Sequence, residues 1–416
     1  MKHAATTLAL LPVLWSTLAS AEPAPISHPP STATAQWRAL TGFRSAGVLD
    51  IVPAMPAPSS VAKAGQDTPL LRLATNGGKK WGLGNYLQLD TFLYSEPVPI
   101  KALDNDWQAP LESGDVILTS DRLEAGVRWD RWQLGAIKRY DYFYRFTPDT
   151  AALIHANKNK TPLETGQRYA LNLDANSLES FGVRLAYSFE VKKGLTGQAA
   201  LSLLRGQEFV AGAIWGEAEA ISDKDFDASF EVDYAYSEDL LFDRITPRPS
   251  GSGYAIDLAL DWRPSRAWRL QFRALDLLSK ILWRDAPFTT ASGNSDNKQY
   301  DEQGYVIYKP VISGLESNRD SNQRIPRKLF FESRYLLENQ LVVLGRYANY
   351  EIKDFWSAGL GYQWGESLAG LLYDPASKAW ALRLDTPLLR FELGSDATTL
   401  DQAHLLSFGL ALAWRY

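Results

Sequence analysis

The chain ends on the segment His404-Leu-Leu-Ser-Phe-Gly-Leu-Ala-Leu-Ala-Trp-Arg-Tyr416, in which apolar residues alternate with small or polar ones. One set of alternate positions carries Leu406, Phe408, Leu410, Leu412, Trp414 and Tyr416, and the other carries Ser407, Gly409, Ala411, Ala413 and Arg415. A period of two is the pattern of a β-strand, because successive side chains point to opposite faces. The segment is therefore predicted to be a strand with one apolar face.

The same alternation continues upstream as far as Leu83. Apolar residues at 123–129 alternate with Arg122, Glu124, Gly126 and Arg128, and those at 181–189 alternate with Gly182, Arg184, Ala186, Ser188 and Glu190. Segments of roughly ten residues with this alternation are typical of transmembrane β-barrels, in which lipid-facing and lumen-facing side chains alternate. We therefore expect an all-β fold, an antiparallel up-and-down barrel that spans a membrane.

The aromatic end of the last strand resembles the C-terminal assembly signal of bacterial outer-membrane β-barrel proteins of the porin-like kind. Leu412, Trp414 and Tyr416 carry the resemblance, although that family usually ends on Phe. It covers the barrel region and identifies no subfamily. It implies the outer membrane of a Gram-negative bacterium, contact with its lipid and lipopolysaccharide, and recognition of the last strand by the barrel-assembly machinery. A homo-oligomer is compatible with this class.

Composition removes several other classes of protein. The 416 residues carry a formal net charge of -5, no cysteine, 14 Trp, 19 Tyr and 17 Phe. Beyond the N-terminus, no apolar run reaches the length of about 18 residues that a transmembrane helix needs. A pI near 5.6 without a basic patch argues against nucleic-acid binding. The absence of cysteine excludes disulfide scaffolds and thiol nucleophiles.

The N-terminal region divides into two parts. Lys2, the apolar stretch from Leu8 to Leu18 and Ala19-Ser20-Ala21 predict a signal peptide over residues 1–21. Residues 22–82 are rich in Pro, Ala, Ser and Thr, so much of this segment is predicted to be linker-like. We interpret it as a periplasmic lead-in, with a plug as the alternative.

Residues 83–416 are predicted to form the barrel. We expect sixteen strands, with fourteen as the alternative because the segments at 367–373, 378–385 and 387–394 are short. Short turns then fall on the periplasmic side and long loops outside, as barrels require. The long extracellular loops are predicted at 95–115, 145–177, 238–252 and 280–326, and residues 149–155 are predicted to be partly helical.

The predicted lumen-facing positions carry many charges. We expect Arg122, Arg128, Arg139, Arg184, Arg269, Arg273, Glu231, Asp233, Asp257 and Asp261 to line the lumen. Rings of arginine favour anions and rings of carboxylates favour cations, so these residues are candidates for a selectivity filter. Opposite charges on neighbouring strands also pair routinely, and cross-strand pairs that neutralise a wet lumen are the alternative interpretation.

The segment 280–326 is longer than an ordinary connection, and loops of this length are usually functional or disordered. Its aromatic residues favour partial order, and Tyr305-Val-Ile-Tyr-Lys309 is predicted to pair as an extra hairpin strand. The segment would either fold inward as a constriction or stand outside as a ligand surface. Its Asn and Asp residues miss the spacing of a calcium loop, so no metal site is expected.

These patterns predict a porin-like channel that passes small hydrophilic solutes or exports a polar polymer. The alternative is a surface barrel whose loops bind a polysaccharide or a cell-surface partner. Only His155 and His404 lie in the barrel region, and neither stands in a hydrolase-like pattern. We therefore expect no enzyme, no catalytic residue and no cofactor.

Overall fold

The structure is a computed structural model that describes residues 83–415 apart from 105–106, 239–245, 296–297 and 308–310. The expected signal peptide, the segment 22–82 and Tyr416 lie outside the described residues, so the predictions for them stay predictions.

Strands dominate the described fold. They are β1 (Gly84–Ser95), β2 (Val116–Trp129), β3 (Trp132–Phe146), β4 (Arg168–Lys192), β5 (Leu195–Ala220), β6 (Phe226–Tyr236), β7 (Ser250–Trp262), β8 (Trp268–Asn294), β9 (Gln299–Tyr300), β10 (Val306–Ile307), β11 (Val311–Gln323), β12 (Lys328–Leu336), β13 (Leu341–Asn349), β14 (Asp354–Trp364), β15 (Ser367–Asp374), β16 (Ala379–Asp385), β17 (Leu389–Ser395) and β18 (Leu405–Arg415). The helices are α4 (Ile100–Asp104), α5 (Pro148–Asn159) and the short 3-10 helix η2 (Glu338–Gln340). None of the described helices has the length and apolar character needed to cross a membrane.

The strands close into an antiparallel barrel, as the alternation predicted. Going round the wall, β1 to β5 are followed by β7, β8 and β12 to β18, and β18 pairs with β1 again. Fourteen strands close the barrel, and β6 and β11 are two extra strands of the same sheet. The expected count of sixteen is therefore wrong for the closed barrel, and the alternative of fourteen is confirmed.

The miscount has a local cause at Gln207. The segments 194–204 and 208–221, predicted as two strands, are the single 26-residue strand β5. The register with β4 jumps from Ser180 opposite Gly206 to Glu179 opposite Glu208, so Gln207 is the extra residue of a β-bulge. Because β5 does not turn back, the connection 222–225 lies at the outer end of the fold, not on the periplasmic side.

The predicted long loops are largely ordered. Segment 280–326 holds the outer part of β8, the hairpin β9–β10 and the strand β11, which pairs with β8. The hairpin confirms the extra strand predicted around Tyr305. Segment 145–177 holds α5 and the first ten residues of β4, and 95–115 holds α4. In α5 the Thr147 hydroxyl caps the helix by accepting from the Thr150 N–H, which confirms the helix predicted at 149–155.

The outward face of the barrel is apolar. Large exposed side chains on this face include Leu134, Val183, Leu203, Leu260, Leu278, Val343, Trp356, Leu360, Leu371, Trp380, Leu382 and Trp414. Aromatic pairs such as Trp132–Tyr187 and Trp268–Tyr335 lie at strand ends, where interfacial aromatic girdles occur. On β14, Trp356, Leu360 and Tyr362 point outward, while Phe355 is buried.

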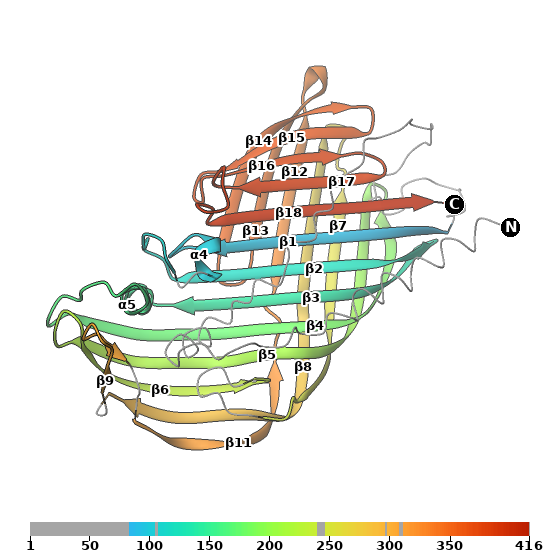
Figure 1. Ribbon diagram of the computed structural model, residues 1–416. Helices are drawn as coiled ribbons and strands as arrows, with labels where there is room; N and C mark the ends of the chain where they lie inside the picture. The colour runs from blue at the N-terminus through green and yellow to red at the C-terminus, as the bar shows by residue number, and fades with distance from the viewer. Residues whose placement is uncertain (1–82, 105–106, 239–245, 296–297, 308–310, 416) are drawn as a thin grey trace, which may run out of the picture.

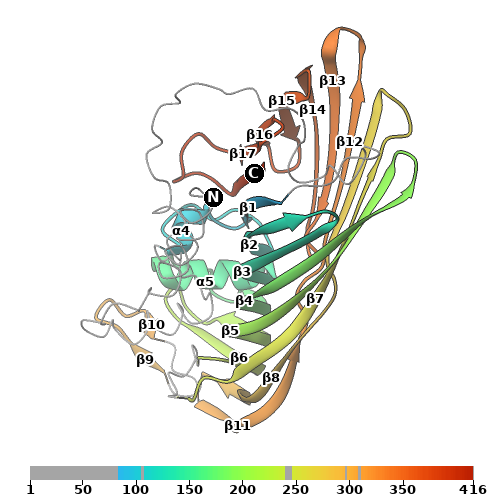
Figure 2. The ribbon, with the colours of Figure 1, turned by 90° about the vertical axis from the view of Figure 1, so that its right-hand side faces the viewer.

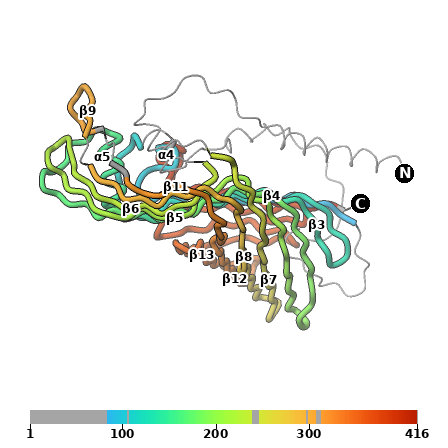
Figure 3. The backbone as a smooth tube through the Cα atoms, turned by 90° about the horizontal axis from the view of Figure 1, so that it is seen from below, coloured from blue at the N-terminus to red at the C-terminus, as the bar shows by residue number. Residues whose placement is uncertain are grey.

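The barrel is flattened. Figures 1 and 3 show β1 to β4 running across the outer parts of β7, β8, β12 and β13, so two walls face each other at a steep angle. Figure 2 shows the same sheet curving from β1 round to β8. Beyond the closed barrel, β4, β5, β6, β8 and β11 continue as an extension of the sheet, with α4 and α5 packed on its outward face.

Candidate functional site in the barrel interior

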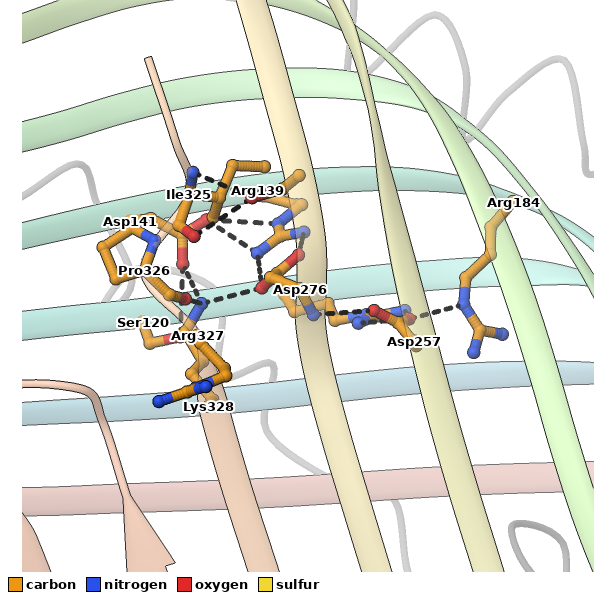
Figure 4. Close-up of polar contacts among 12 residues, drawn as sticks. Ser120, Arg139, Asp141, Arg184, Asp257, Asp276, Ile325, Pro326, Arg327 and Lys328 are labelled. Atoms are coloured by element: carbon orange, nitrogen blue, oxygen red, sulfur yellow. Dashed lines mark hydrogen bonds and ion pairs between the residues drawn. The ribbon is translucent and has the colours of Figure 1, made fainter.

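The barrel interior is filled by two clusters of charged side chains. The first, which we call the central cluster, contains Arg122 on β2, Arg139 and Asp141 on β3, Arg184 on β4, Asp257 on β7, Asp276 on β8 and Lys328 on β12. All seven residues are buried. Figure 4 shows Asp276 between Arg139 and Lys328, with Asp257 reaching Arg184 on its other side.

Asp276 lies at the centre of this cluster because the strand β8 is bulged there. The register between β7 and β8 shifts between Ile256 and Leu258, and Asp276 has a φ of 57°. Asp is one of the few residues that tolerate this left-handed conformation. The main-chain N–H of Asp276 donates to Asp257 Oδ1 at 3.0 Å, which joins the two carboxylates into one unit.

The central cluster joins opposite walls of the barrel. The Arg139 guanidinium donates to both carboxylate oxygens of Asp276, at 2.6 and 2.7 Å. Lys328 Nζ lies 2.6 Å from Asp141 Oδ1 and 3.1 Å from Asp276 Oδ2. Arg139 and Asp141 are on β3, Asp276 is on β8 and Lys328 is on β12, and β3 is not a neighbour of either of the other two strands. The contacts between these side chains therefore cross the barrel interior. In the described conformation the central cluster closes the interior.

Two arginines complete the cluster around Asp257. Arg184 Nε donates to Asp257 Oδ2 at 3.1 Å, and Arg122 Nη2 lies 3.3 Å from the same oxygen. Arg122 also contacts Glu124 Oε2 at 3.1 Å, and the Tyr86 hydroxyl donates to Glu124 Oε1 at 2.6 Å. Each charge thus has an opposite partner, which burial in a low-dielectric interior demands.

The second cluster lies on β12, β13, β16 and β17. Arg383 Nη1 donates to Glu332 at 2.6 Å, while Arg334 and Arg390 approach Asp385 at 2.7 and 3.1 Å. In the same cluster Arg346 Nη1 donates to Glu392 at 2.6 Å. Arg390 and Asp385 are on the adjacent strands β17 and β16. Because β14 and β15 separate β13 from β16, the other pairs span several strands.

A cavity of about 180 Å³ lies between the two clusters. Its basic lining residues are Arg122, Arg139, Arg273, Lys328, Arg346, Arg383 and Arg390, and its acidic ones are Asp90, Glu332, Asp374 and Glu392. Asp141, Asp276 and Asp385, which pair with several of these cations, do not line it. The cavity therefore faces more cations than carboxylates.

Arg273 differs from the other lining cations. Within the described part of the chain it forms no ion pair, and its guanidinium lies over the Phe330 ring at 4.9 Å from the centroid. Phe330 belongs to an aromatic group with Tyr350, Phe92 and Phe355, in which Phe92 and Tyr350 stack at 4.3 Å. The arrangement gives the cavity one partly exposed cation on an aromatic wall.

The structure brings together most of the predicted lumen residues. Arg122, Arg139, Arg184, Asp257, Asp261 and Arg269 all face the interior, and Arg269 Nη2 pairs with Asp261 at 2.6 Å. Arg273 lines the cavity, and Arg128 lies opposite Gln133 near the periplasmic end of β2. Their pairing matches the alternative of cross-strand ion pairs, while a role in selectivity stays a prediction.

Glu231 and Asp233 are placed differently from the expectation. They lie on β6, which is outside the closed barrel, and Asp233 pairs with Arg319 of β11 at 2.9 Å in the outer extension. The prediction that they line the lumen is therefore wrong, because β6 pairs only with the parts of β5 and β8 that extend beyond the closed barrel. Asp141, Asp276, Lys328, Glu332 and Glu392 are interior charges that the sequence analysis missed.

Ion pairs also hold the outer loops. Glu96, just after β1, contacts Lys353 between β13 and β14 and accepts from the Asp115 N–H at 2.9 Å. Burial raises the pKa of Glu96, but the hydrogen bonds from Lys353 and Asp115 outweigh it and hold the pKa below its usual value. The carboxylate therefore stays charged and ties two loops together at the barrel mouth.

The two histidines that sequence analysis considered as catalytic bases serve as anchors. The His155 Nε2 atom lies 2.7 Å from the Ala109 carbonyl oxygen, and His404 Nδ1 lies 2.8 Å from that of Ser95. Both contacts fix loops to neighbouring elements. Within the described residues, no group of acidic or histidine side chains is arranged to hold a metal ion.

An open groove of about 540 Å³ lies above the barrel on the lumen-side face of the extension. It is lined by Arg145, Asp174, Asn176, Trp215 and Asp233, among others, and Trp215 is 41% exposed. The groove combines an exposed aromatic ring with polar and charged groups.

A closed antiparallel barrel with an apolar outward face, short turns at one end and long connections at the other is the architecture of β-barrel proteins of the Gram-negative outer membrane. The chain is an outer-membrane β-barrel of this type. No family model and no curated protein matches the sequence.

Among solved structures, the chain has a low similarity to several outer-membrane channels. A variant of the monoaromatic hydrocarbon channel TodX is 11% identical over 80% of this chain and 90% of that one, with a TM-score of 0.38. The toluene transporter TbuX of Ralstonia pickettii is 8% identical over 81% and 90%, with a TM-score of 0.30. A FadL homologue from Pseudomonas aeruginosa is 10% identical over 80% and 86%, with a TM-score of 0.29. At these values the substrates of those proteins are not carried over to this chain.

Proposed function

We propose that this chain is an outer-membrane channel that passes small hydrophilic solutes and favours anions. The observation that carries the proposal is the cavity between the two charged clusters, with its excess of cations and with Arg273 held on Phe330. Fixed cations in a narrow aqueous passage lower the energy of an anion and raise that of a cation. Arg273 is the anion-facing group, since the other arginines already hold carboxylates.

Opening requires the walls to separate. In the described conformation Arg139 and Lys328 hold Asp276 and Asp141 across the interior. A solute would pass when these contacts exchange for water or for the solute itself. The cavity has room for small solutes and is far too small for an extended polymer chain.

The test is the reversal potential of the reconstituted full-length channel in a gradient of KCl. We expect stepwise conductance and a reversal potential of anion-selective sign. Arg273→Gln should move this potential towards zero, because one cation leaves the passage. Arg168→Gln is the matched control, since Arg168 is exposed at the outer end of β4 and pairs with Glu219. A cation-selective wild-type channel, or an equal shift in the control, would contradict the proposal.

The groove above the barrel supports a second candidate function, binding of a carbohydrate. Exposed Trp215 offers a flat face for a sugar ring, and Asp174 and Asn176 offer hydrogen-bonding groups beside it. If this is the main function, Trp215→Ala abolishes polysaccharide binding and leaves conductance unchanged. Loss of conductance without any binding phenotype would favour the channel alone.

A further inference from the structure

Three basic side chains stand together on the outward face of the barrel. Arg205 on β5 and Lys280 and Arg284 on β8 are all exposed. The strand β7 lies between them, with Ser252 opposite Arg205 on one side and opposite Leu282 on the other. Lys280 and Arg284 flank Leu282 on the same face. We call this group the basic rim.

The register gives the basic rim a width of about 10 Å across the strands and a length of about 14 Å along β8. Two steps between neighbouring strands separate Arg205 from Leu282, at about 4.8 Å each. Lys280 and Arg284 lie two residues to either side of Leu282, which is about 7 Å along the strand. The long side chains of Arg205, Lys280 and Arg284 therefore reach a common point on the surface.

The basic rim sits at the outer edge of the apolar band. Arg205 is ten residues from Leu195, which pairs with Trp262 beside the short periplasmic turn. Ten residues rise about 34 Å along a strand. With the usual barrel tilt this becomes about 24–28 Å along the membrane normal, close to the height of the apolar belt. The rim therefore lies at the level of the outer-leaflet head groups.

Apolar side chains lie directly below it. Leu203 is 62% exposed and Leu278 is 60% exposed. Tyr254 on β7 lies opposite Leu203 on one side and opposite Lys280 on the other. A membrane lipid that places its acyl chains on this surface puts its head group beside the three cations. The face thus presents, from the inside outward, an apolar strip and then a positive one.

Arg205, Lys280 and Arg284 have no carboxylate partner among the residues that the structure describes. Their neighbour Arg248, in contrast, pairs with Glu208 at 3.5 Å. The rim therefore carries a local charge of three that an external anion can satisfy.

We propose that Arg205, Lys280 and Arg284 bind the phosphate groups of a glycolipid of the outer leaflet, a lipid A-type molecule with two phosphates. Guanidinium groups suit phosphate because they donate two parallel hydrogen bonds, and the lysine adds a point charge. The acyl chains pack on Leu203, Tyr254 and Leu278. This site is independent of transport through the lumen.

The experiment measures binding of bisphosphorylated lipid A to the full-length protein in detergent or nanodiscs, by native mass spectrometry or fluorescence. The triple variant Arg205→Gln, Lys280→Gln, Arg284→Gln should bind lipid A at least about tenfold more weakly than the wild type. Each basic residue near a charged surface contributes a factor of roughly ten or less to the affinity, and three such residues are removed. The matched control is Lys192→Gln, Lys193→Gln, Arg266→Gln, which removes the same charge from exposed periplasmic turns. This control should bind like the wild type.

Two further arms identify the ligand. Dephosphorylated lipid A should bind weakly to the wild type, and inorganic phosphate alone should compete only weakly, because it lacks the acyl chains. Equal affinity of the triple variant and the wild type would overturn the proposal, as would an equal loss in the control. If the triple variant does not fold, as judged by heat-modifiable migration, single Lys280→Gln and Arg284→Gln variants give the same comparison, with a smaller expected loss.

Discussion

Replacement of Asp276 by asparagine is expected to open the barrel. Asp276 holds Arg139 through two hydrogen bonds of 2.6 and 2.7 Å and Lys328 at 3.1 Å, and all three side chains are buried. Asparagine keeps the shape of the side chain and tolerates the φ of 57° at this position, so the substitution removes mainly the charge.

The magnitude follows from the loss of one partner in a buried ion pair, about 3–5 kcal/mol. Arg139 and Lys328 keep Asp141 as a partner, so we take the lower end, about 3 kcal/mol. If these contacts break when the walls separate, the ratio of closed to open barrels falls by about 100-fold, because 1.4 kcal/mol corresponds to a factor of ten.

The assay is the open probability of single channels in planar bilayers. Asp261→Asn is the matched control: Asp261 is also buried and paired, but its partner Arg269 is on the adjacent strand of the same hairpin. This pair does not cross the interior, so its loss should leave the open probability unchanged. Folded Asp276→Asn barrels with wild-type open probability would refute the assignment of the central cluster as a closure.

Three further predictions concern the barrel wall. Leu360 lies on the outward face of β14, so Leu360→Arg should destabilise the folded barrel in liposomes by about 2–4 kcal/mol if it lies near the bilayer midplane. Leu360→Ala should destabilise it by much less. Similar urea midpoints for the unfolding of the two variants would show that Leu360 faces the lumen. Deletion of Gln207 removes the extra residue of the bulge, so the side chains of the outer part of β5 should exchange faces and Ile214 and Ala218 should become exposed. The extension of the sheet should then be sensitive to protease. An extension that stays resistant would refute the bulge. Trp414→Ala should lower the fraction of heat-modifiable, folded protein in cells, and an unchanged fraction would remove this residue from the assembly signal.

The alternation of the sequence was sufficient to predict the barrel class and the facing of most strands. On β4 the apolar residues Phe181, Val183 and Leu185 are exposed and Arg184 is buried, as parity requires. The pattern succeeds because lipid and lumen impose opposite demands on successive residues.

The strand count failed where a turn signal had another cause. Arg205-Gly206-Gln207 resembles a turn between two strands, yet the chain runs straight on through a bulge. Gly206 is required there for close packing, because a Cβ atom would lie 2.3 Å from the Trp283 ring. A glycine that permits close packing and a glycine that permits a turn look the same in a sequence.

The charged interior was predictable only in part. Parity placed Arg139, Arg184 and Asp257 inside, but it assigned no inward position to Asp276, because the bulge in β8 turns this side chain to the other face. The contact between Arg139 and Asp276 joins residues 137 positions apart on strands that are not neighbours. Such contacts depend on how far the barrel is flattened, which local patterning does not determine.

The measurement that tests the central proposal most directly is a single-channel recording of the reconstituted full-length protein across a KCl gradient, with wild type and Asp276→Asn compared. We predict stepwise conductance with an anion-selective reversal potential, rare openings in the wild type and frequent ones in the variant. Folded barrels that never conduct in either form, or a reversal potential of cation-selective sign, would contradict the assignment of this protein as an anion-favouring channel.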